Sequence, residues 1–251
     1  MSGLVKVNSV KSDNIPDFLK SLPHWVVWKS FNTRDDGRFD KIPIHPISGH
    51  KINGQDKRNQ MDFNIAFKLY EKGVGNGVGI VLNGQPLTMK NTCLSQYLIG
   101  VDLDKVTESS EKIDVAKNTC KSIGSYYEIS PSGKGIRIFA LSKNPLGRGQ
   151  SVHGEMYYKN RFLTITGHGQ KREIVEATNV LLKIEREWWP EAQLKTKQKP
   201  KLLFYNYPDT PRKRAELDNM LRFISSDCSY ERYRDVVWAI LSTRWPDANS
   251  L

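Results

Sequence analysis

The segment YLIGVDLDKV, residues 97–106, decides the fold because it joins an apolar body to an abrupt acidic end. This pattern is typical of a central β-strand that carries Asp102 and Asp104 at its tip. Alternate residues of a strand point the same way, so the two carboxylates can bind one or two divalent cations. Burying two like charges without a cation would be costly. A solvated acidic pair at a loop is the simpler alternative, and for an isolated Asp-x-Asp it is the commoner one.

The elements predicted on either side of this strand give an α+β fold, with a mixed or antiparallel sheet and flanking helices. Asp62 can cap one helix, and Ser109 or Ser110 can cap another. The Lys159-Asn160 connection predicts a hairpin between the last two strands. The strands are predicted at residues 24–29, 77–82, 97–104, 125–130, 135–141, 153–158 and 161–167.

Composition limits the classes of protein to consider. The chain has 251 residues, and its 38 Lys and Arg against 27 Asp and Glu give a net charge of +11, which favours a polyphosphate or nucleic-acid partner only weakly. Hydrophobic residues at 38% suffice for a core, but no apolar run approaches the ~20 residues of a membrane span. The N-terminus lacks a secretory signal, so we expect a cytoplasmic protein without a membrane partner. The three cysteines have no zinc-ligand spacing.

The pattern changes after about residue 178, which predicts three parts. We expect a catalytic domain over residues 1–190, a lysine-rich linker over 191–214 and a helical region over 215–251. Two amphipathic helices bury little apolar surface alone, so the last part is interpreted as the truncated start of a helical domain.

A second motif, ISPSGKGIRIF, residues 129–139, places a Ser132-Gly133 turn ahead of a strand with Lys134 and Arg137. Glycine lets a backbone approach phosphate oxygens, and two cations would neutralise a polyphosphate. The motif is not a P-loop, because Gly135 stands where that loop needs Ser or Thr. An ordinary hairpin turn explains the segment equally well.

The third motif is HGEMYYKNRFLTITGHG, residues 153–169, in which Glu155 interrupts an apolar and aromatic strand. A buried acid needs a partner. A metal shared with the aspartates and an ion pair with Arg161 both remain open. His168 lies in a glycine-rich loop, where a histidine is usually only exposed, although a phosphate contact is possible.

Together, and in this order, the three motifs resemble the primase-polymerase domains of the archaeo-eukaryotic primase superfamily, in the branch carried by phages and plasmids. WVVWK at 25–29, KIPIHPISG at 41–49 and GVGIVL at 77–82 support the resemblance. It implies an RRM-like core and template-dependent DNA primase and polymerase activity in phage or plasmid replication. Many members have His where Arg137 stands and Asp where Glu155 stands; arginine can bind a triphosphate but cannot shuttle a proton, so Arg137 is not expected to act as a general acid.

The resemblance also implies roles for particular residues. Asp102, Asp104 and Glu155 would hold two Mg²⁺ or Mn²⁺ ions for nucleotidyl transfer. The nucleotide would be bound by Ser132, Gly133, Lys134, Arg137, His168 and Lys41. The implied partners are a single-stranded DNA template, dNTP or NTP substrates and a helicase, either C-terminal or separate. A chain of this length is expected to extend primers but not to start them.

Two alternatives stay open. An Asp-x-Asp nucleotide-sugar transferase would also bind Mn²⁺, but its acceptor explains neither the basic linker nor the second motif. A non-catalytic replication initiator would bind origin DNA as a basic α/β module without polymerising.

Overall fold

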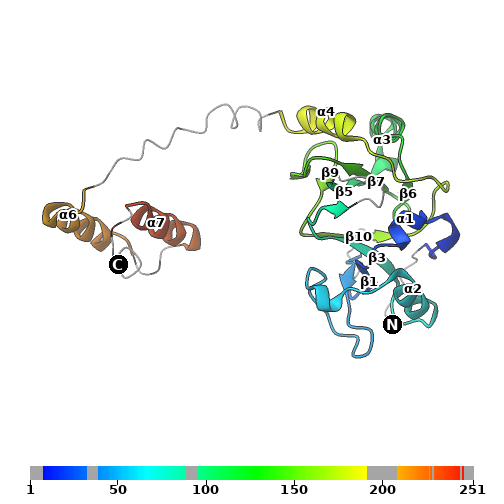
Figure 1. Ribbon diagram of the computed structural model, residues 1–251, viewed down its shortest axis with the longest axis horizontal. Helices are drawn as coiled ribbons and strands as arrows, with labels where there is room; N and C mark the ends of the chain where they lie inside the picture. The colour runs from blue at the N-terminus through cyan, green and yellow to red at the C-terminus, as the bar shows by residue number, and fades with distance from the viewer. Residues whose placement is uncertain are drawn as a thin grey trace. The chain divides into compact units, whose positions relative to one another are not determined.

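The computed structural model describes residues 8–32, 39–88, 95–190, 208–225, 227, 229–243 and 245. The chain divides into two compact units, Met1–Gln193 and Leu194–Leu251. Figure 1 shows the first as stacked sheets and helices and the second as helices alone. Lys195, Lys197, Lys199 and Lys201 of the predicted linker lie outside the described residues. No helix in the described segments is long and apolar enough to cross a membrane.

A four-stranded antiparallel sheet forms one half of the first unit, in the order β10-β3-β1-β2. Its apolar side chains, including Trp25, Ile80 and Leu163, share a core with α2 and with the second sheet. Its elements are β1 (Trp25–Lys29), β2 (Ile42–Pro43), β3 (Gly77–Leu82), β10 (Arg161–Ile165), α1 (Asp17–Lys20), α2 (Phe63–Glu71) and the 3-10 turns η1 (Ser12–Asn14) and η2 (Lys57–Asn59).

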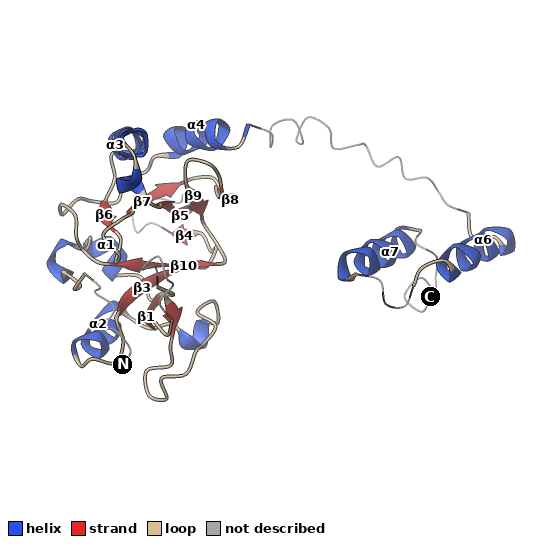
Figure 2. Ribbon diagram, turned by 180° about the vertical axis from the view of Figure 1, so that it is seen from behind, coloured by secondary structure: helices blue, strands red, loops and turns tan. Residues whose placement is uncertain are grey.

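The second sheet runs β6-β7-β5-β9-β8, with β4 beside the start of β5, and every ladder in it is antiparallel. Helices α3 and α4 cover one face (Figure 2) and pack on Val101 and Leu103 of β5. The predicted α+β class with antiparallel strands is confirmed. Its elements are β4 (Leu87–Thr88), β5 (Ser95–Leu103), η3 (Val106–Glu108), α3 (Ser110–Ile123), β6 (Tyr127–Ile129), β7 (Ile136–Ser142), β8 (Gly149–Gln150), β9 (Glu155–Tyr157) and α4 (Thr178–Trp188).

The predicted hairpin at Lys159-Asn160 is wrong, because β9 pairs with β5 in one sheet and β10 pairs with β3 in the other. The turn itself is tight, with Asn160 at a φ of 55°. It moves the chain between sheets, so that Leu163 and Ile165 enter the core between them. The two sheets approach closely at Gly100, where an added Cβ would collide with Leu163.

The second unit contains α6 (Pro211–Arg222) and α7 (Tyr230–Ser242). Helix α6 begins with Pro at its first position, and the Thr210 hydroxyl accepts a hydrogen bond from the Lys213 amide. Arg212, Lys213 and Arg214 therefore lie in a helix, although the sequence assigned them to the linker.

Candidate active site

A row of five polar side chains crosses the second sheet on the face opposite α3 and α4. The strand register places Glu128 opposite Arg137, Arg137 opposite Asp102, Asp102 opposite Glu155 and Glu155 opposite Gln150. Directly opposed residues of antiparallel strands share a face and interact. The neighbours of Asp102 along β5, Val101 and Leu103, point to the other face and into the helix-covered core. The sheet thus brings motifs that are distant in the sequence into one line.

Asp102 and Arg137 form the centre of this row, and both are buried. The Arg137 Nε atom lies 3.3 Å from Asp102 Oδ1, yet neither atom has a hydrogen-bond partner in the described part of the chain. Arg137 instead donates from Nη1 to the carbonyl and the hydroxyl of Thr164 on β10. The cation that compensates Asp102 is therefore the Arg137 guanidinium, which faces the buried Oδ1 atom.

Asp104 is exposed, just beyond the end of β5. Lys41 lies within electrostatic range of Asp102 and Asp104. Burial lowers the pKa of Lys41, and Arg137 lowers it further, while Asp102 and Asp104 raise it. The Lys41 ammonium also lies 5.4 Å from the centre of the Phe39 ring. Lys41, a candidate from sequence, is thus within electrostatic range of the acidic pair.

Glu155 is only slightly exposed and is already paired. Its Oε2 atom accepts hydrogen bonds of 2.9 Å from Arg161 Nη2 and from the Tyr157 hydroxyl. Burial and this hydrogen bond raise the pKa of Tyr157 to about 12. Of the two interpretations of Glu155, the structure therefore shows the ion pair with Arg161.

Glu128 closes the other end of the row, and sequence analysis missed it. It is fully buried and accepts hydrogen bonds from the Tyr126 hydroxyl and from the backbone amides of Thr166 and Gly167. Burial raises its pKa, and these hydrogen bonds with the nearby Arg137 charge offset part of that effect. An acid inside an apolar strand, the signal that identified Glu155, would also have identified Glu128.

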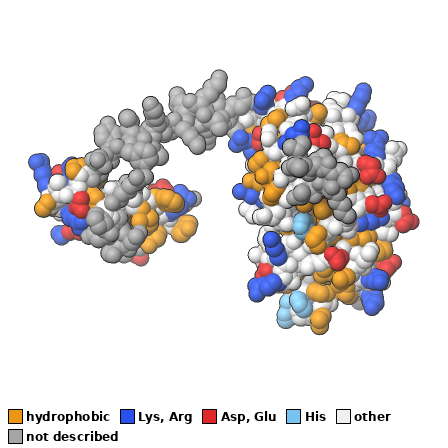
Figure 3. Space-filling view, in the orientation of Figure 1, with side chains coloured by type: hydrophobic (Ala, Val, Ile, Leu, Met, Phe, Trp, Pro, Cys, Tyr) orange, Lys and Arg blue, Asp and Glu red, His pale blue; other side chains and the backbone are white. Residues whose placement is uncertain are grey.

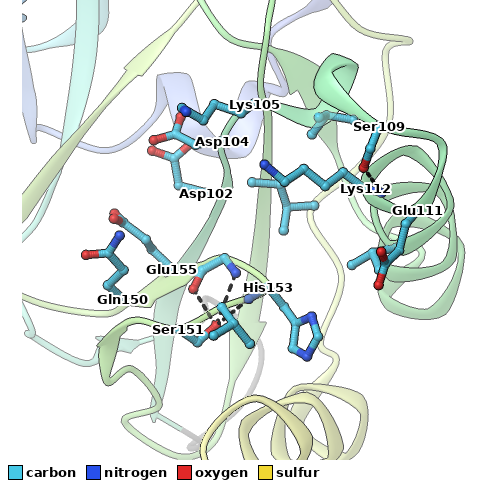
Figure 4. Close-up of a pocket in the computed structure, with 15 residues that line it drawn as sticks. Asp102, Asp104, Lys105, Ser109, Glu111, Lys112, Gln150, Ser151, His153 and Glu155 are labelled. Carbon is cyan, nitrogen blue, oxygen red and sulfur yellow. Dashed lines mark hydrogen bonds between the residues drawn. The ribbon is translucent and has the colours of Figure 1, made fainter.

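A cavity of about 440 Å³ opens where β5 ends, between the start of α3 and the loop before β9. Figure 4 shows the carboxylates of Asp102, Asp104 and Glu155 and the amide of Gln150 directed to the same side. The α3 side of the cavity brings Lys105 and Lys112, which both pair with Glu108. Ser109 caps α3 as expected, by accepting from the Lys112 amide at 3.2 Å.

The Ser-Gly-Lys turn lies next to Asp104. Gly133 adopts a φ of 75°, which favours glycine, and its amide donates to the Ser130 carbonyl within the turn. An added Cβ at Gly135 would lie 3.4 Å from Asp104 Oδ1 and 2.8 Å from the Leu103 carbonyl oxygen. The turn is thus a hairpin turn that approaches the acidic pair, and its Lys134 side chain is exposed.

His168 has a different environment from the other candidates. Its Nε2 atom lies 2.7 Å from the Ser9 carbonyl oxygen, and its own carbonyl accepts from the Ile129 amide. His168 does not line the cavity, and its contacts within the described chain tie the N-terminal segment to the sheet.

The donor chemistry of Asp102 and Asp104 fits a hard divalent cation, because all donors are carboxylate oxygens and both side chains line the cavity. Within the described residues, no three His, Cys, Asp or Glu side chains are grouped to hold a metal ion. Glu155 lines the same cavity, with its Oε2 atom engaged by Arg161 and Tyr157.

The antiparallel sheet, the Asp-x-Asp strand end and the adjoining basic turn fit the primase-polymerase class that the motifs indicated. The chain is similar to the DNA Primase-polymerase of Nitratiruptor phage NrS-1, at 30% identity over 159 residues. That alignment covers 59% of this chain but only 20% of the phage protein. No model of a protein family matches the chain. The predicted resemblance to a phage primase-polymerase domain is thereby confirmed.

Proposed function

We propose that the first unit is the catalytic domain of a template-dependent DNA primase-polymerase. The observation that carries the proposal is the convergence of three carboxylates at one cavity: Asp102 on β5, Glu155 in register with it on β9, and Asp104 just beyond the end of β5. The similarity to a phage DNA Primase-polymerase supports the same activity.

The residues of the chain take distinct parts in nucleotidyl transfer. Asp102, Asp104 and Glu155 would bind two Mg²⁺ or Mn²⁺ ions, which activate a 3′-hydroxyl and offset the charge on pyrophosphate. Lys41 is within electrostatic range of Asp102 and Asp104, and the exposed Lys134 belongs to the turn that approaches Asp104; both would offset the triphosphate charge. Arg137 holds Asp102 in place, since its guanidinium contacts both Asp102 and Thr164.

The proposed partners follow from this reaction. They are a single-stranded DNA template, dNTP or NTP substrates and a helicase that works with the polymerase. Replication of a phage or plasmid in the host cytoplasm is the proposed setting.

Asp102→Asn tests the proposal by primer extension on an annealed template with Mn²⁺. We expect extension to fall by more than about 100-fold, because the amide keeps the shape and removes a charged metal ligand. Binding of single-stranded DNA should change little.

Glu111→Gln is the matched control, because Glu111 lines the same cavity from α3 and is expected to leave extension near the wild-type rate. Full extension by Asp102→Asn would refute the polymerase assignment. DNA binding without polymerisation by the wild type would favour the initiator alternative.

A further inference from the structure

Phe31 lies just beyond the end of strand β1 in the four-stranded sheet, and its exposed aromatic ring contacts the ammonium group of Lys51. The residue is 43% exposed, and the Lys51 ammonium lies 4.9 Å from its ring centre. Phe31 lies two residues beyond the end of β1, and Lys51 forms a β-bridge with Ile44, which follows β2. Neither residue contributes to the core clusters. The feature that sets Phe31 apart from other exposed apolar residues is the ammonium of Lys51 against its ring.

The backbone around Phe31 is fixed by Asp40. The Asp40 carboxylate accepts hydrogen bonds from the amides of Phe31 at 2.7 Å and Asn32 at 3.1 Å, and from the Ser30 hydroxyl at 3.2 Å. The Ser30 amide in turn donates to Asn76 at 2.8 Å. These hydrogen bonds hold the backbone of residues 30–32, from which the Phe31 ring extends to the surface.

Asp40 is followed in the chain by Lys41. The charges of Asp102 and Asp104 raise the pKa of the Lys41 ammonium, which is therefore within electrostatic range of the acidic pair. Lys41 also lies over Phe39, which stacks on Trp28 at 6.1 Å between ring centres. Asp40 thus links the backbone of Phe31 to Lys41, a cation within electrostatic range of the acidic pair.

Among the described residues, the charge near the ring favours an anionic partner. Lys51, Lys29 and His50 are exposed near it, whereas the Asp40 carboxylate is turned inward to its hydrogen-bond donors. Figure 3 shows basic, histidine and apolar side chains together at the end of the unit that holds β1.

We propose that Phe31 and Lys51 form a stacking platform for an unpaired base of the single-stranded nucleic acid that enters the site as template. The identification of the bound strand as template rests on the proposed function, whereas binding of a single strand to Phe31 and Lys51 does not require catalysis. Aromatic rings accept any base on their π-face, while lysine neutralises the adjoining phosphate, which gives sequence-tolerant binding.

An unpaired strand fits better than the two other nucleic-acid ligands of a polymerase. A base can stack on a protein ring only when it is free of its own stack, which excludes the primer–template duplex. The incoming nucleotide carries its charge on a triphosphate, and the groups suited to that charge, Lys41 and Lys134, lie at the acidic end.

The test compares Phe31→Leu, Phe31→Trp and Lys51→Gln in the full chain, by fluorescence anisotropy with a labelled oligothymidylate. We expect Phe31→Leu to weaken binding about tenfold and Phe31→Trp to retain it, because stacking needs a ring. Lys51→Gln should reduce the slope of log affinity against log salt by about 0.7, the value for one phosphate contact on a single strand.

Ile47→Ser is the matched control, because Ile47 is 91% exposed on the neighbouring turn and should leave affinity unchanged. Wild-type affinity in Phe31→Leu would overturn the inference, as would an equal loss on blunt duplex DNA or a loss confined to the KM for the nucleotide. Asp102→Asn keeps the two proposals separable: full extension by that variant refutes the polymerase, whereas the oligothymidylate result decides the platform alone.

Discussion

Two carboxylates of the polar row, Glu128 on β6 and Asp102 on β5, are in opposite states. Both oxygens of Glu128 accept hydrogen bonds, from Tyr126, Thr166 and Gly167. Asp102 has a buried oxygen without a hydrogen bond, 3.3 Å from Arg137 Nε, and its side chain lines the cavity beside the exposed Asp104. The carboxylate with every partner supplied by the chain joins the two sheets, whereas the carboxylate at the cavity is the one that a ligand can reach.

The largest expected effect is that of Arg137→Met, which removes the cation that lies between Glu128 and Asp102 in the row. Breaking a buried ion pair leaves Asp102 uncompensated, so the free energy of unfolding should fall by about 3–5 kcal/mol. Urea denaturation measures the change. Lys112→Met, in an exposed pair with Glu108, is the control and should cost no more than about 1 kcal/mol. An Arg137 loss as small as the control would mean that the centre of the row does not hold the sheets.

Alkaline pH should lower the stability of the row through Tyr126, which donates to Glu128, and Tyr157, which donates to Glu155. Burial raises the pKa of each tyrosine above the ordinary 10.0. A raised tyrosine pKa means that stability is fully present below pH 10 and is lost as pH rises, because the unfolded chain releases the proton first. Tyr157 loses its contribution through about pH 12, where its folded pKa lies.

Urea denaturation between pH 9 and pH 11 measures this loss. Tyr126→Phe should flatten the pH dependence by up to about 1.4 kcal/mol per pH unit, the slope for one proton. Tyr157→Phe should flatten it by no more than that. An unchanged slope in Tyr126→Phe would contradict a proton held against Glu128.

The smallest expected effect on stability is that of Arg161→Gln, because the Arg161 side chain is 44% exposed and such pairs contribute at most about 1 kcal/mol. The same change should raise Mn²⁺ affinity several-fold, since Glu155 loses the charge that competes with a cation. Calorimetric titration with Mn²⁺ measures it, with Arg148→Gln as a control at another partly exposed ion pair. Unchanged Mn²⁺ affinity would show that Glu155 is structural.

Sequence patterns predicted the parts of this site that depend on long elements. The apolar run of β5 placed Asp102 and Asp104 at a strand end, and the Ser109 cap located the start of α3. Register could not be predicted, because β8 and β9 have only two and three residues and show no periodicity. The hairpin prediction failed for the same reason. The ion pair of Arg137 with Asp102 follows from that register, and so does the alignment of Glu128 with both.

The crossover between β9 and β10 has a mechanical consequence. Glu155 belongs to one sheet and Arg161 to the other, with only Tyr158, Lys159 and Asn160 between their strands. The ion pair between them therefore joins the two sheets next to the proposed metal site. A cation that drew Glu155 away from Arg161 would remove this one link, while the apolar core between the sheets would stay in place.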